Sequence, residues 1–350
     1  MSQQGRKILL ISLTRTGSTA YASAIADALS SYNPIIITSK RAKNDFTHID
    51  KTIETYTGKL SFILKSIPFF IKAAGLLKGY NEKERVILYL PVFHPWNLFL
   101  AMWAGVYGIP VISTVHDYHT HQGEESATTE IIQKLQMMIS DKVIFLTQHQ
   151  KQEALKEHPN KESHFTVLSH PILESGAYHN LDHSKEMKFL FFGRIKAYKG
   201  YELVINAADN EEIKQITIAG TGDPIKTSNS KITLINRHLT NQEISNLLST
   251  HHVLLLPYLE TSQSGILTLG IDSGIPLIIS QLPGIEEQLE KPCGIWIDPT
   301  SEALTPAMTL IQSDKELYDN IKENLKSYKS KYQNTFKEKL NQLLHSLHSL

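Results

Sequence analysis

Short, continuous apolar runs alternate with helical patterns along the whole chain, and this alternation limits its possible folds more than any other feature. Buried parallel strands read as unbroken Val, Ile and Leu runs because helices cover both faces of the sheet. Their alternation with helices predicts an α/β fold with parallel sheets. The runs are Ile8–Leu13, Pro34–Thr38, Val86–Pro91, Pro110–Val115, Lys142–Leu146 and Thr166–Leu168, then Lys188–Phe192, Gln215–Ala219, Lys231–Ile235, Val253–Pro257, Pro276–Ser280 and Gly294–Ile297.

The chain has 350 residues, which is too long for one core at about 150 residues per domain. A polar stretch without apolar periodicity, Glu174–Glu186, separates the two series of runs. We predict an N-terminal domain over 1–173, a linker over 174–186, a C-terminal domain over 187–325 and a helix over 326–350, for which packing on the first domain is one option. Two doubly wound domains of this kind are expected to face each other across a ligand cleft.

Composition excludes several classes of protein. Lys and Arg together number 35, as do Asp and Glu, and this zero net charge argues against a general nucleic-acid binder. The single cysteine, Cys293, excludes a disulfide scaffold and a cysteine zinc cluster, and indicates a reducing compartment. No signal-peptide pattern precedes the first strand, and no apolar run reaches about 18 residues. We therefore expect a cytoplasmic protein without a spanning helix.

The segment from residue 57 to 79 is basic and apolar. It contains Lys59, Lys65, Lys72 and Lys78 and no acidic residue, and Pro68 is expected to kink or break its helix. Such a helix can lie in the interface of an anionic membrane. The alternative is a pair of core helices whose lysines lie on the solvent-exposed side. The sequence leaves open a peripheral contact with the inner face of the membrane.

The string FLFFGRIKAYKGYELVINA, residues 189–207, places two cations directly after a buried strand. The strand ends at Gly193, Arg194 and Lys199 lie in the loop, and Gly200 precedes a helix. Two cations at the carboxyl end of a buried strand suit a diphosphate whose charge develops on a leaving group. As a bare spacing, the same pair is also typical of a solvated surface loop.

The whole string resembles the donor-binding signature of retaining family-4 glycosyltransferases of the GT-B fold. Three further strings resemble later parts of that signature in the same order: ITIAGTGD (216–223), NQEISNLLSTHHVLLLPY (241–258) and SQSGILTLGIDSGIPLIIS (262–280). The resemblance implies two Rossmann-like domains and a nucleotide-diphosphate sugar as donor. It also implies that no metal or other cofactor is needed, because Arg194 and Lys199 would neutralise the leaving diphosphate.

The same resemblance implies the donor-binding residues. They are Gly17 in TRTGST, Gly193, Gly220, Glu260, Thr261, Gln263, Ser264 and Gly265. Gln263, Ser264 and Gly265 are expected to open a helix whose free N–H groups and positive end bind a diphosphate. A lone Ser-Gly before a helix would otherwise be read as a simple cap.

One position departs from the family. The family carries two glutamates at the positions of Thr261 and Leu269, and the second of them contacts the ribose. Glu260 neighbours the first position, but the second carboxylate is missing. The Q-S-G form with an apolar residue there resembles a sub-branch of polysaccharide-assembly transferases. Whether Leu269 changes nucleotide choice or abolishes activity stays open.

In the N-terminal half, VISTVHDYHTHQGEE (111–125) leaves a buried strand and presents His116. The resemblance implies that His116 is catalytic, and that Asp117, His121 and Glu124 lie on the acceptor side. A structural histidine is one alternative. A metal site formed by His116, His119 and His121 is another, since neutral imidazoles suit zinc.

The implied activity is that of a retaining glycosyltransferase of the hexosyltransferase type, acting on a glycan or lipid-linked glycan in surface polysaccharide synthesis. The dinucleotide, P-loop and hydrolase-elbow patterns are absent from the sequence. Two alternatives remain, because a fold does not fix a function. One is a non-catalytic nucleotide-sugar-binding subunit of a membrane glycan-assembly complex, and the other is a GT-B sugar-nucleotide epimerase or hydrolase.

Overall fold

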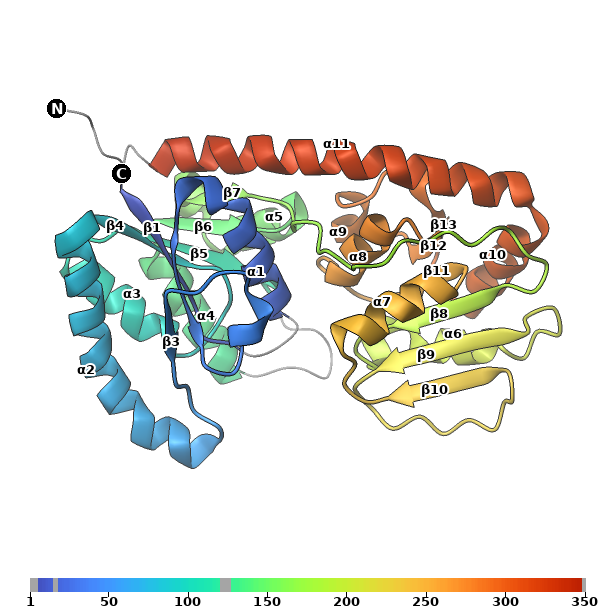
Figure 1. Cartoon of the computed structure of the whole chain (residues 1–350), viewed down its shortest axis with the longest axis horizontal. Coiled ribbons are helices and arrows are strands. Elements are labelled where there is room, and N and C mark those ends of the chain that lie inside the picture. The colour runs from blue at the N-terminus through green and yellow to red at the C-terminus, as the bar shows by residue number, and fades with distance from the viewer. Residues whose placement is uncertain (1–5, 15–17, 120–126, 348–350) are drawn as a thin grey trace. The chain divides into compact units, whose positions relative to one another are not determined.

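The computed structural model describes residues 6–14, 18–119 and 127–347, and it forms two compact units (Figure 1). The first unit contains Met1–Pro171 and Phe336–Leu350, and the second contains Ile172–Thr335. Each unit is a parallel sheet covered by helices on both faces. The predicted α/β class is therefore confirmed.

The first unit holds a seven-stranded sheet in the order β3-β2-β1-β4-β5-β6-β7, with every neighbouring pair parallel. Its strands are β1 (Lys7–Ser12), β2 (Ile35–Ser39), β3 (Lys51–Ile53), β4 (Val86–Leu90), β5 (Val111–Val115), β6 (Lys142–Phe145) and β7 (Phe165–Val167). The order reverses between β1 and β4. In doubly wound sheets, ligands bind at the carboxyl ends of the strands at such a reversal.

Helices cover both faces of this sheet. They are α1 (Ser18–Ala28), α2 (Lys59–Glu84), α3 (Asn97–Val106), α4 (Ala127–Ile139) and α5 (Gln148–Glu157). On one face, α1 packs on alternate residues of the strands such as Ile8 and Leu10. On the other face, α2 and α3 pack on the intervening residues, such as Leu9 and Ile11. The split follows from the period of two in a strand. The 3₁₀ segments are Ser30–Tyr32, Lys43–Asp45 and Pro159–His164.

The second unit holds a six-stranded parallel sheet in the order β10-β9-β8-β11-β12-β13. Its strands are β8 (Lys188–Phe192), β9 (Gln215–Gly220), β10 (Ile232–Asn236), β11 (Val253–Leu256), β12 (Leu277–Ser280) and β13 (Ile295–Ile297). Its helices are α6 (Tyr201–Ala207), α7 (Asn241–Thr250), α8 (Gly265–Ser273), α9 (Pro283–Glu286) and α10 (Ser301–Ser313), with 3₁₀ segments at Ala197–Lys199 and Lys291–Cys293. The order reverses between β8 and β11.

The last helix, α11 (Lys315–Leu347), contributes to both units. Its first part buries Tyr318 and Leu325 in the core of the second unit. Its last part buries Phe336, Leu340 and Leu344 in the core of the first unit, on the face covered by α1. The chain passes from one unit to the other between Thr335 and Phe336.

Residues 174–186, interpreted from the sequence as a linker, are counted in the second unit. The N–H and Oγ of Ser175 both donate to Oδ2 of Asp272, each at 2.7 Å. Nε2 of His179 lies 3.0 Å from the carbonyl oxygen of His251. These bonds hold the start of the segment to the second unit. Polar contacts therefore fix a stretch that has no apolar periodicity.

The helix after residue 58 differs from its prediction. It runs continuously from Lys59 to Glu84 with Pro68 inside it, so of the two outcomes expected at Pro68, a kink or a break, the break was wrong. Leu77, beyond the proline, and Phe69 beside it are buried in the core, and this packing holds the helix together across the missing hydrogen bond. Among the described residues, α2 is also the one helix long and apolar enough to cross a bilayer by length and composition.

Candidate active site

At the carboxyl edge of the second sheet, glycines let the backbone pack closely. Gly193 (φ +136°) follows β8, and Gly220 (φ +142°) ends β9. A Cβ on Gly220 would lie 1.7 Å from the carbonyl oxygen of Gly193. A Cβ on Gly200 (φ +73°) would lie 1.9 Å from that of Pro257. The loop after β8 is therefore pressed against the ends of β9 and β11, which only glycine allows.

This loop brings Arg194 and Lys199 to one aromatic ring. Cζ of Arg194 lies 5.9 Å from the ring centroid of Tyr198, and Nζ of Lys199 lies 5.2 Å from the same centroid. Nζ of Lys199 also lies 3.8 Å from the ring centroid of Tyr258, just after β11. Cations over aromatic faces are held by the ring quadrupole. The two cations therefore lie together where the strand order reverses.

Helix α8 begins beside this pair. Oγ of Ser264 accepts from the N–H of Leu267 at 3.1 Å and lies 3.0 Å from the hydroxyl of Tyr258, the ring under Lys199. The N–H of Ser264 itself donates to Oε1 of Gln288 at 2.7 Å, so this N–H group already has a hydrogen-bond acceptor within the protein. The N–H groups of Gly265 and Ile266 in the first turn precede any intrahelical acceptor and remain at the positive end of the helix.

The loop before α8 carries the other predicted donor residues. Thr261 is buried, and its hydroxyl donates to the carbonyl oxygen of Gln263 at 2.6 Å. Oε1 of Gln263 is buried without a hydrogen-bond partner among the described residues. Glu260 is exposed. Leu269, at the position of the family's second glutamate, packs half-buried against the core, so an apolar side chain fills that place.

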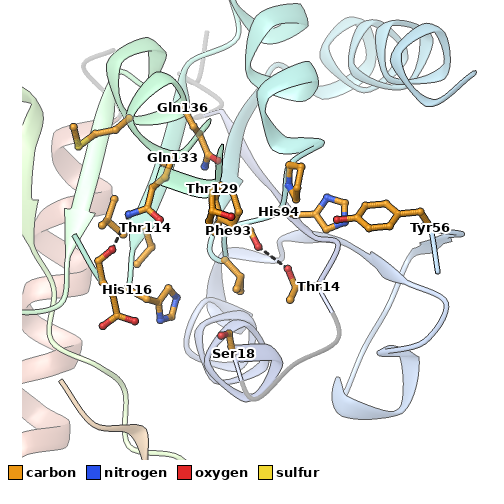
Figure 2. Close-up of a pocket in the computed structure, with 16 residues that line it drawn as sticks. Thr14, Ser18, Tyr56, Phe93, His94, Thr114, His116, Thr129, Gln133 and Gln136 are labelled. Atoms are coloured by element: carbon orange, nitrogen blue, oxygen red, sulfur yellow. Dashed lines mark hydrogen bonds between the residues drawn. The ribbon is translucent and has the colours of Figure 1, made fainter. Parts of the chain in front are cut away.

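The first unit has a pocket of about 430 Å³ at the carboxyl ends of its central strands (Figure 2). It is lined by residues from the ends of β1, β4 and β5, from the segment after β3, from the start of α1 and from α4. They are Thr14, Ser18, Tyr56, Val92, Phe93, His94, Pro95, Ser113, Thr114, Val115, His116, Asp117, Thr129, Gln133, Gln136 and Met137. None of these is Lys or Arg. Asp117 supplies one carboxylate, and the other polar side chains carry hydroxyls, amides and imidazoles, a set that suits a hydroxyl-bearing ligand.

His116 lies at the end of β5 and lines this pocket. Its Nε2 lies 3.0 Å from the carbonyl oxygen of Pro91. A carbonyl oxygen only accepts, so Nε2 carries the hydrogen and donates. Its ring meets the ring of Tyr21 edge-on at 4.5 Å between centroids. Burial lowers the pKa of His116, although the Pro91 carbonyl and Asp117 oppose the shift. The ring is therefore neutral at neutral pH, and Nδ1 keeps a lone pair.

Sequence reasoning missed His94 and Tyr56. His94 follows β4, and its Nδ1 accepts from the N–H of Trp96 at 3.2 Å. Burial lowers its pKa to about 4. The rings of Tyr56 and His94 are 5.3 Å apart, at the opposite end of the pocket from His116 (Figure 2). The string VFHPW directly after a buried run was a signal for His94, but nothing local to Tyr56 indicated that it would reach the same pocket.

Two polar contacts hold the walls of the pocket. Oγ1 of Thr14, after β1, donates to the carbonyl oxygen of Phe93, after β4, at 2.8 Å. Nε2 of Gln133, on α4, donates to the carbonyl oxygen of Asp117 at 2.7 Å. Asp117, predicted on the acceptor side, therefore lines the pocket next to His116.

Three predicted residues, Gly17, His121 and Glu124, lie outside the described residues. His121 is also the third histidine of the alternative metal site. Within the described part of the chain, no three His, Cys, Asp or Glu side chains are grouped so that they could hold a metal ion. His119 is exposed and meets the ring of Tyr118 at 4.7 Å.

The whole chain is similar in structure to glycosyltransferases and related enzymes. A sucrose-phosphate synthase from Thermosynechococcus elongatus covers 98% of this chain, and the match covers 99% of that protein, at 17% identity and a TM-score of 0.71. Anabaena HepE in complex with UDP-glucose covers 97%, with 99% of HepE covered, at 15% identity and a TM-score of 0.74. A UDP-N-acetylglucosamine 2-epimerase covers 91%, with 91% of that chain covered, at 13% identity and a TM-score of 0.60. The chain has the GT-B fold.

The sequence adds a more specific similarity within the second unit. Residues 186–314 match the family model described as Glycosyl transferases group 1. This range contains the loop of Arg194 and Lys199 and the start of α8. No curated protein matches the chain by sequence. The family model and the GT-B neighbours together support a glycosyltransferase.

Proposed function

We propose that this protein is a retaining glycosyltransferase that moves a hexosyl group from a nucleotide-diphosphate sugar to a glycan or lipid-linked glycan in surface polysaccharide synthesis. The observation that carries the proposal is the convergence of Arg194 and Lys199 on Tyr198, where the strand order of the second sheet reverses. Both cations lie in the range that matches the glycosyltransferase family model.

The second unit would bind the donor. The diphosphate would lie between the two cations and the N–H groups of Gly265 and Ile266. This arrangement supplies charge-assisted hydrogen bonds and the positive helix end without a metal ion. Oε1 of Gln263, which has no partner among the described residues, would accept a hydrogen bond from the nucleoside. Uridine is the base we propose, because HepE is described in complex with UDP and with UDP-glucose.

In the reaction, the bond between the sugar's anomeric carbon and the diphosphate oxygen breaks as a new bond to the acceptor hydroxyl oxygen forms on the same face. The departing phosphate oxygen takes the proton of that hydroxyl. Negative charge therefore grows on the diphosphate, and Arg194 and Lys199 stabilise it there. Binding that strengthens as charge develops lowers the barrier, which is why these two residues are proposed as catalytic.

The acceptor would bind in the pocket of the first unit. The described residues of its lining include no Lys or Arg, and their hydroxyl and amide groups suit the hydroxyls of a sugar. Nδ1 of neutral His116 would accept a hydrogen bond from a sugar hydroxyl, and Tyr56 would pack against a sugar ring. The buried cysteine, whose thiol pKa burial raises to about 11, is unreactive and in keeping with a cytoplasmic site of action.

Two specific observations favour other functions, an epimerase and a non-catalytic binding subunit. The likeness to a UDP-N-acetylglucosamine 2-epimerase shows that an epimerase can use this fold. Leu269, in place of a carboxylate, favours a subunit that binds nucleotide sugar without turnover. The match of residues 186–314 to a glycosyltransferase model weighs against both.

The test begins with the change in unfolding temperature on adding UDP, GDP, ADP, CMP or dTDP and their sugar conjugates. A nucleotide present at 100 times its Kd adds about 2.7 kcal/mol to the stability. We expect a rise with UDP compounds alone, followed by release of UDP from UDP-glucose in the presence of an acceptor glycan. Binding without release would assign the protein to the binding subunits, and release of an epimerised sugar nucleotide would assign it to the epimerases. The absence of any shift would contradict a donor site at Arg194 and Lys199.

A further inference from the structure

The exposed apolar side chains of this protein are concentrated on one surface of the first unit. Eleven of the fifteen large hydrophobic side chains that are exposed in the described residues lie on α2, α3 and α4. They are Leu60, Ile63, Leu64, Ile67 and Ile71 on α2, Met102 and Val106 on α3, and Ile131, Leu135, Met138 and Ile139 on α4. Helix α3 contacts both α2 and α4, so the three helices form one continuous surface, called here the α2–α4 face.

Helix α2 is apolar on two sides. Its exposed residues 60, 63, 64, 67 and 71 follow the spacing of one helical face, and Leu60 and Ile67 are 72% and 71% exposed. Its other side buries Phe69, Ala73 and Leu77 in the core. The inner side already accounts for the folding of the helix. The outer side therefore needs a separate explanation, because apolar patches of this extent mark interaction sites.

The helix is fixed to the unit along its length. The ring of Phe69 stacks on that of Trp96 at 4.3 Å. Nε1 of Trp96 donates to Oγ of Ser66 at 2.9 Å, and Nε1 of Trp103 donates to the carbonyl oxygen of Phe70 at 3.0 Å. Although α2 is long enough to cross a bilayer, crossing would remove these contacts. A bilayer would therefore meet α2 from its side.

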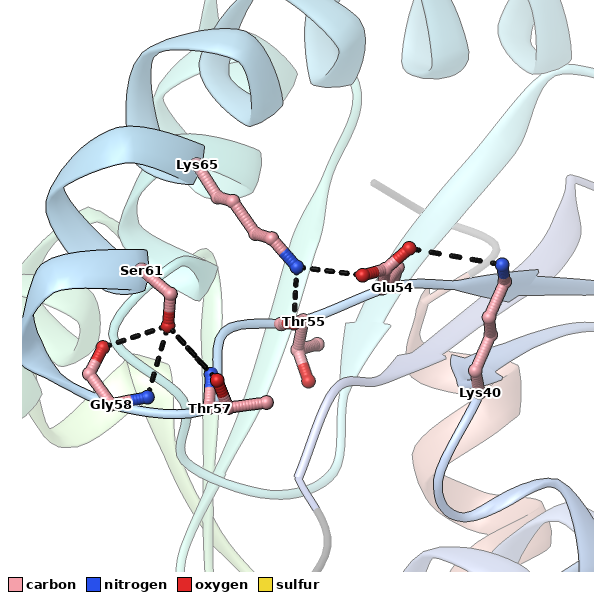
Figure 3. Close-up of polar contacts among 7 residues, drawn as sticks. All are labelled: Lys40, Glu54, Thr55, Thr57, Gly58, Ser61 and Lys65. Carbon is pink, nitrogen blue, oxygen red and sulfur yellow. Dashed lines mark hydrogen bonds and ion pairs between the residues drawn. The ribbon is translucent and has the colours of Figure 1, made fainter.

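The start of the helix is fixed as well. Oγ of Ser61 accepts from the N–H groups of Thr57 and Gly58, at 2.8 and 3.0 Å (Figure 3). Figure 3 also shows that Nζ of Lys65 turns back to Oε1 of Glu54 at 2.7 Å. The first turn is therefore held in place, and the charge of Lys65 is used within the protein.

The lysines of α2 differ in whether they form an ion pair within the protein. Lys78 pairs with Glu82 at 3.8 Å, as Lys65 does with Glu54. Lys59 and Lys72 are exposed and have no hydrogen bond or ion pair with any described residue. Helix α3 has no charged residue, and the acidic residue within α4 is Glu130. The net charge of the chain is zero, and Lys59 and Lys72, about 140° apart around α2, flank its exposed apolar side chains on either side.

We propose that the α2–α4 face is a membrane-docking surface that lies flat in the headgroup region of an anionic bilayer. Its apolar side chains would enter the acyl boundary while Lys59 and Lys72 pair with anionic headgroups. A second copy of the chain fits less well. A two-fold interface would pair this face with its own copy, and α3 and α4 together offer the lysines one acidic residue, Glu130. This proposal does not depend on the proposed activity.

The experiment is sedimentation of the full chain with vesicles, either of phosphatidylcholine alone or of phosphatidylcholine with phosphatidylglycerol. We expect binding to the anionic vesicles. Replacing Ile63, Ile67 and Ile71 together by Gln should lower that binding at least tenfold, because the apolar contact area is lost. The matched control is Leu310→Gln, an exposed leucine on α10 in the second unit, which should bind as the unchanged chain does.

The charge contribution has its own pair of variants. Lys59→Gln with Lys72→Gln should weaken binding to anionic vesicles by about fivefold for each lysine. Lys226→Gln with Lys326→Gln makes the same change in net charge in the second unit and should have no effect. Circular dichroism and the unfolding temperature confirm that each variant is folded.

Three outcomes would overturn the proposal. They are no binding of the folded chain to anionic vesicles, equal binding of the isoleucine variant, or a dimer that the isoleucine variant alone dissociates. The last would assign the α2–α4 face to a second copy. Because vesicle binding is measured without nucleotide, its failure is distinct from failure of the donor site.

Discussion

The two units place different chemistry at the same position of a doubly wound sheet. In the second unit, the reversal between β8 and β11 carries close-packed glycines and two cations, Arg194 and Lys199. In the first unit, the reversal between β1 and β4 opens into a pocket lined by hydroxyls, amides and neutral histidines. One edge suits an anion and the other suits a neutral polyol, so the fold sets where a ligand binds and the loops set which ligand it is.

The difference also bears on how each site is built. The cationic edge depends on backbone approach, which demands glycine at fixed positions in one stretch of sequence. The pocket of the first unit depends on side chains from the ends of three strands, the segment after β3, the start of α1 and α4. A glycine substitution at the cationic edge should therefore act mainly through the fold, whereas substitution of a ligand-facing side chain in either unit should act mainly through the ligand.

The largest expected effect is on the glycine packing of the second unit. Gly220→Ala would place a Cβ 1.7 Å from the carbonyl oxygen of Gly193 and should lower the free energy of unfolding by about 3 kcal/mol or more. Gly274→Ala is the matched control, because Gly274 also has a positive φ (+77°) but an added Cβ would meet nothing within 4 Å. It should cost about 1 kcal/mol. Urea unfolding of both variants measures the difference, and equal losses would show that close approach is not the constraint.

The next effect concerns the buried histidines of the first unit. Burial lowers the pKa of His94 and of His170 to about 4 from 6.5. The unfolded chain then binds more protons than the folded chain between those values, so stability falls as the pH falls through this window. For each of the two histidines, the free energy of unfolding should fall by about 2 kcal/mol between about pH 7.5 and pH 5.

Urea unfolding across this pH range tests the effect with His170→Asn, whose amide can still donate to the Pro171 carbonyl that Nδ1 of His170 reaches at 2.7 Å. The variant should show a shallower fall in stability than the unchanged chain. His238→Asn, at an exposed position, should leave the profile as it is. An unchanged slope for His170→Asn would mean that this histidine is not held neutral by burial.

The third prediction addresses the cationic edge directly. Lys199→Ala and Arg194→Ala should each weaken UDP binding at least tenfold, because a hydrogen bond to a charged group contributes about 1.5 kcal/mol or more. Lys196→Ala is the control on the same loop, since Nζ of Lys196 is held by Asp223 at 2.7 Å. Calorimetric titration with UDP gives the affinities. If Lys196→Ala weakens binding as much as Lys199→Ala, the site is a general basic patch.

The smallest effect tests whether the two sites are separate. Gln133→Leu removes the amide that donates to the carbonyl oxygen of Asp117 and should lower the stability by about 1 kcal/mol. UDP affinity should stay unchanged, while the KM for an acceptor should rise. A change in UDP affinity would indicate that the pocket of the first unit takes part in donor binding.

Much of the fold could be predicted from the sequence. Each of the twelve apolar runs coincides with a strand. Most of these strands are buried on both faces, which leaves an unbroken run, whereas β10, at the edge of its sheet, is largely exposed. The missed strand is β3, which has three residues, of which Ile53 alone is buried. A kink or break was expected at Pro68 because local rules count the lost hydrogen bond. They cannot count the packing of Phe69 and Leu77, which keeps the helix continuous.

The candidate sites were predictable to different degrees. Arg194, Lys199 and Ser264 could be found because their neighbourhoods are continuous in sequence. Tyr56 and Gln133 could not, because they reach the pocket from the segment after β3 and from α4. His116 was found through its position at a strand end, whereas His94, at the end of the adjacent strand, was passed over.

The sequence by itself determined the alternation of strands and helices, the glycines after β8 and β9, and the cations beside them, because each depends on neighbours a few residues away. Tertiary structure decided that Lys199 lies over the ring of Tyr258 and that Lys65 pairs with Glu54, while Lys59 has no partner in the described part of the chain. It also decided that the α2–α4 face gathers apolar residues from three helices. These features depend on distances between segments far apart in the chain, and only the packing of the sheet and its helices sets those distances.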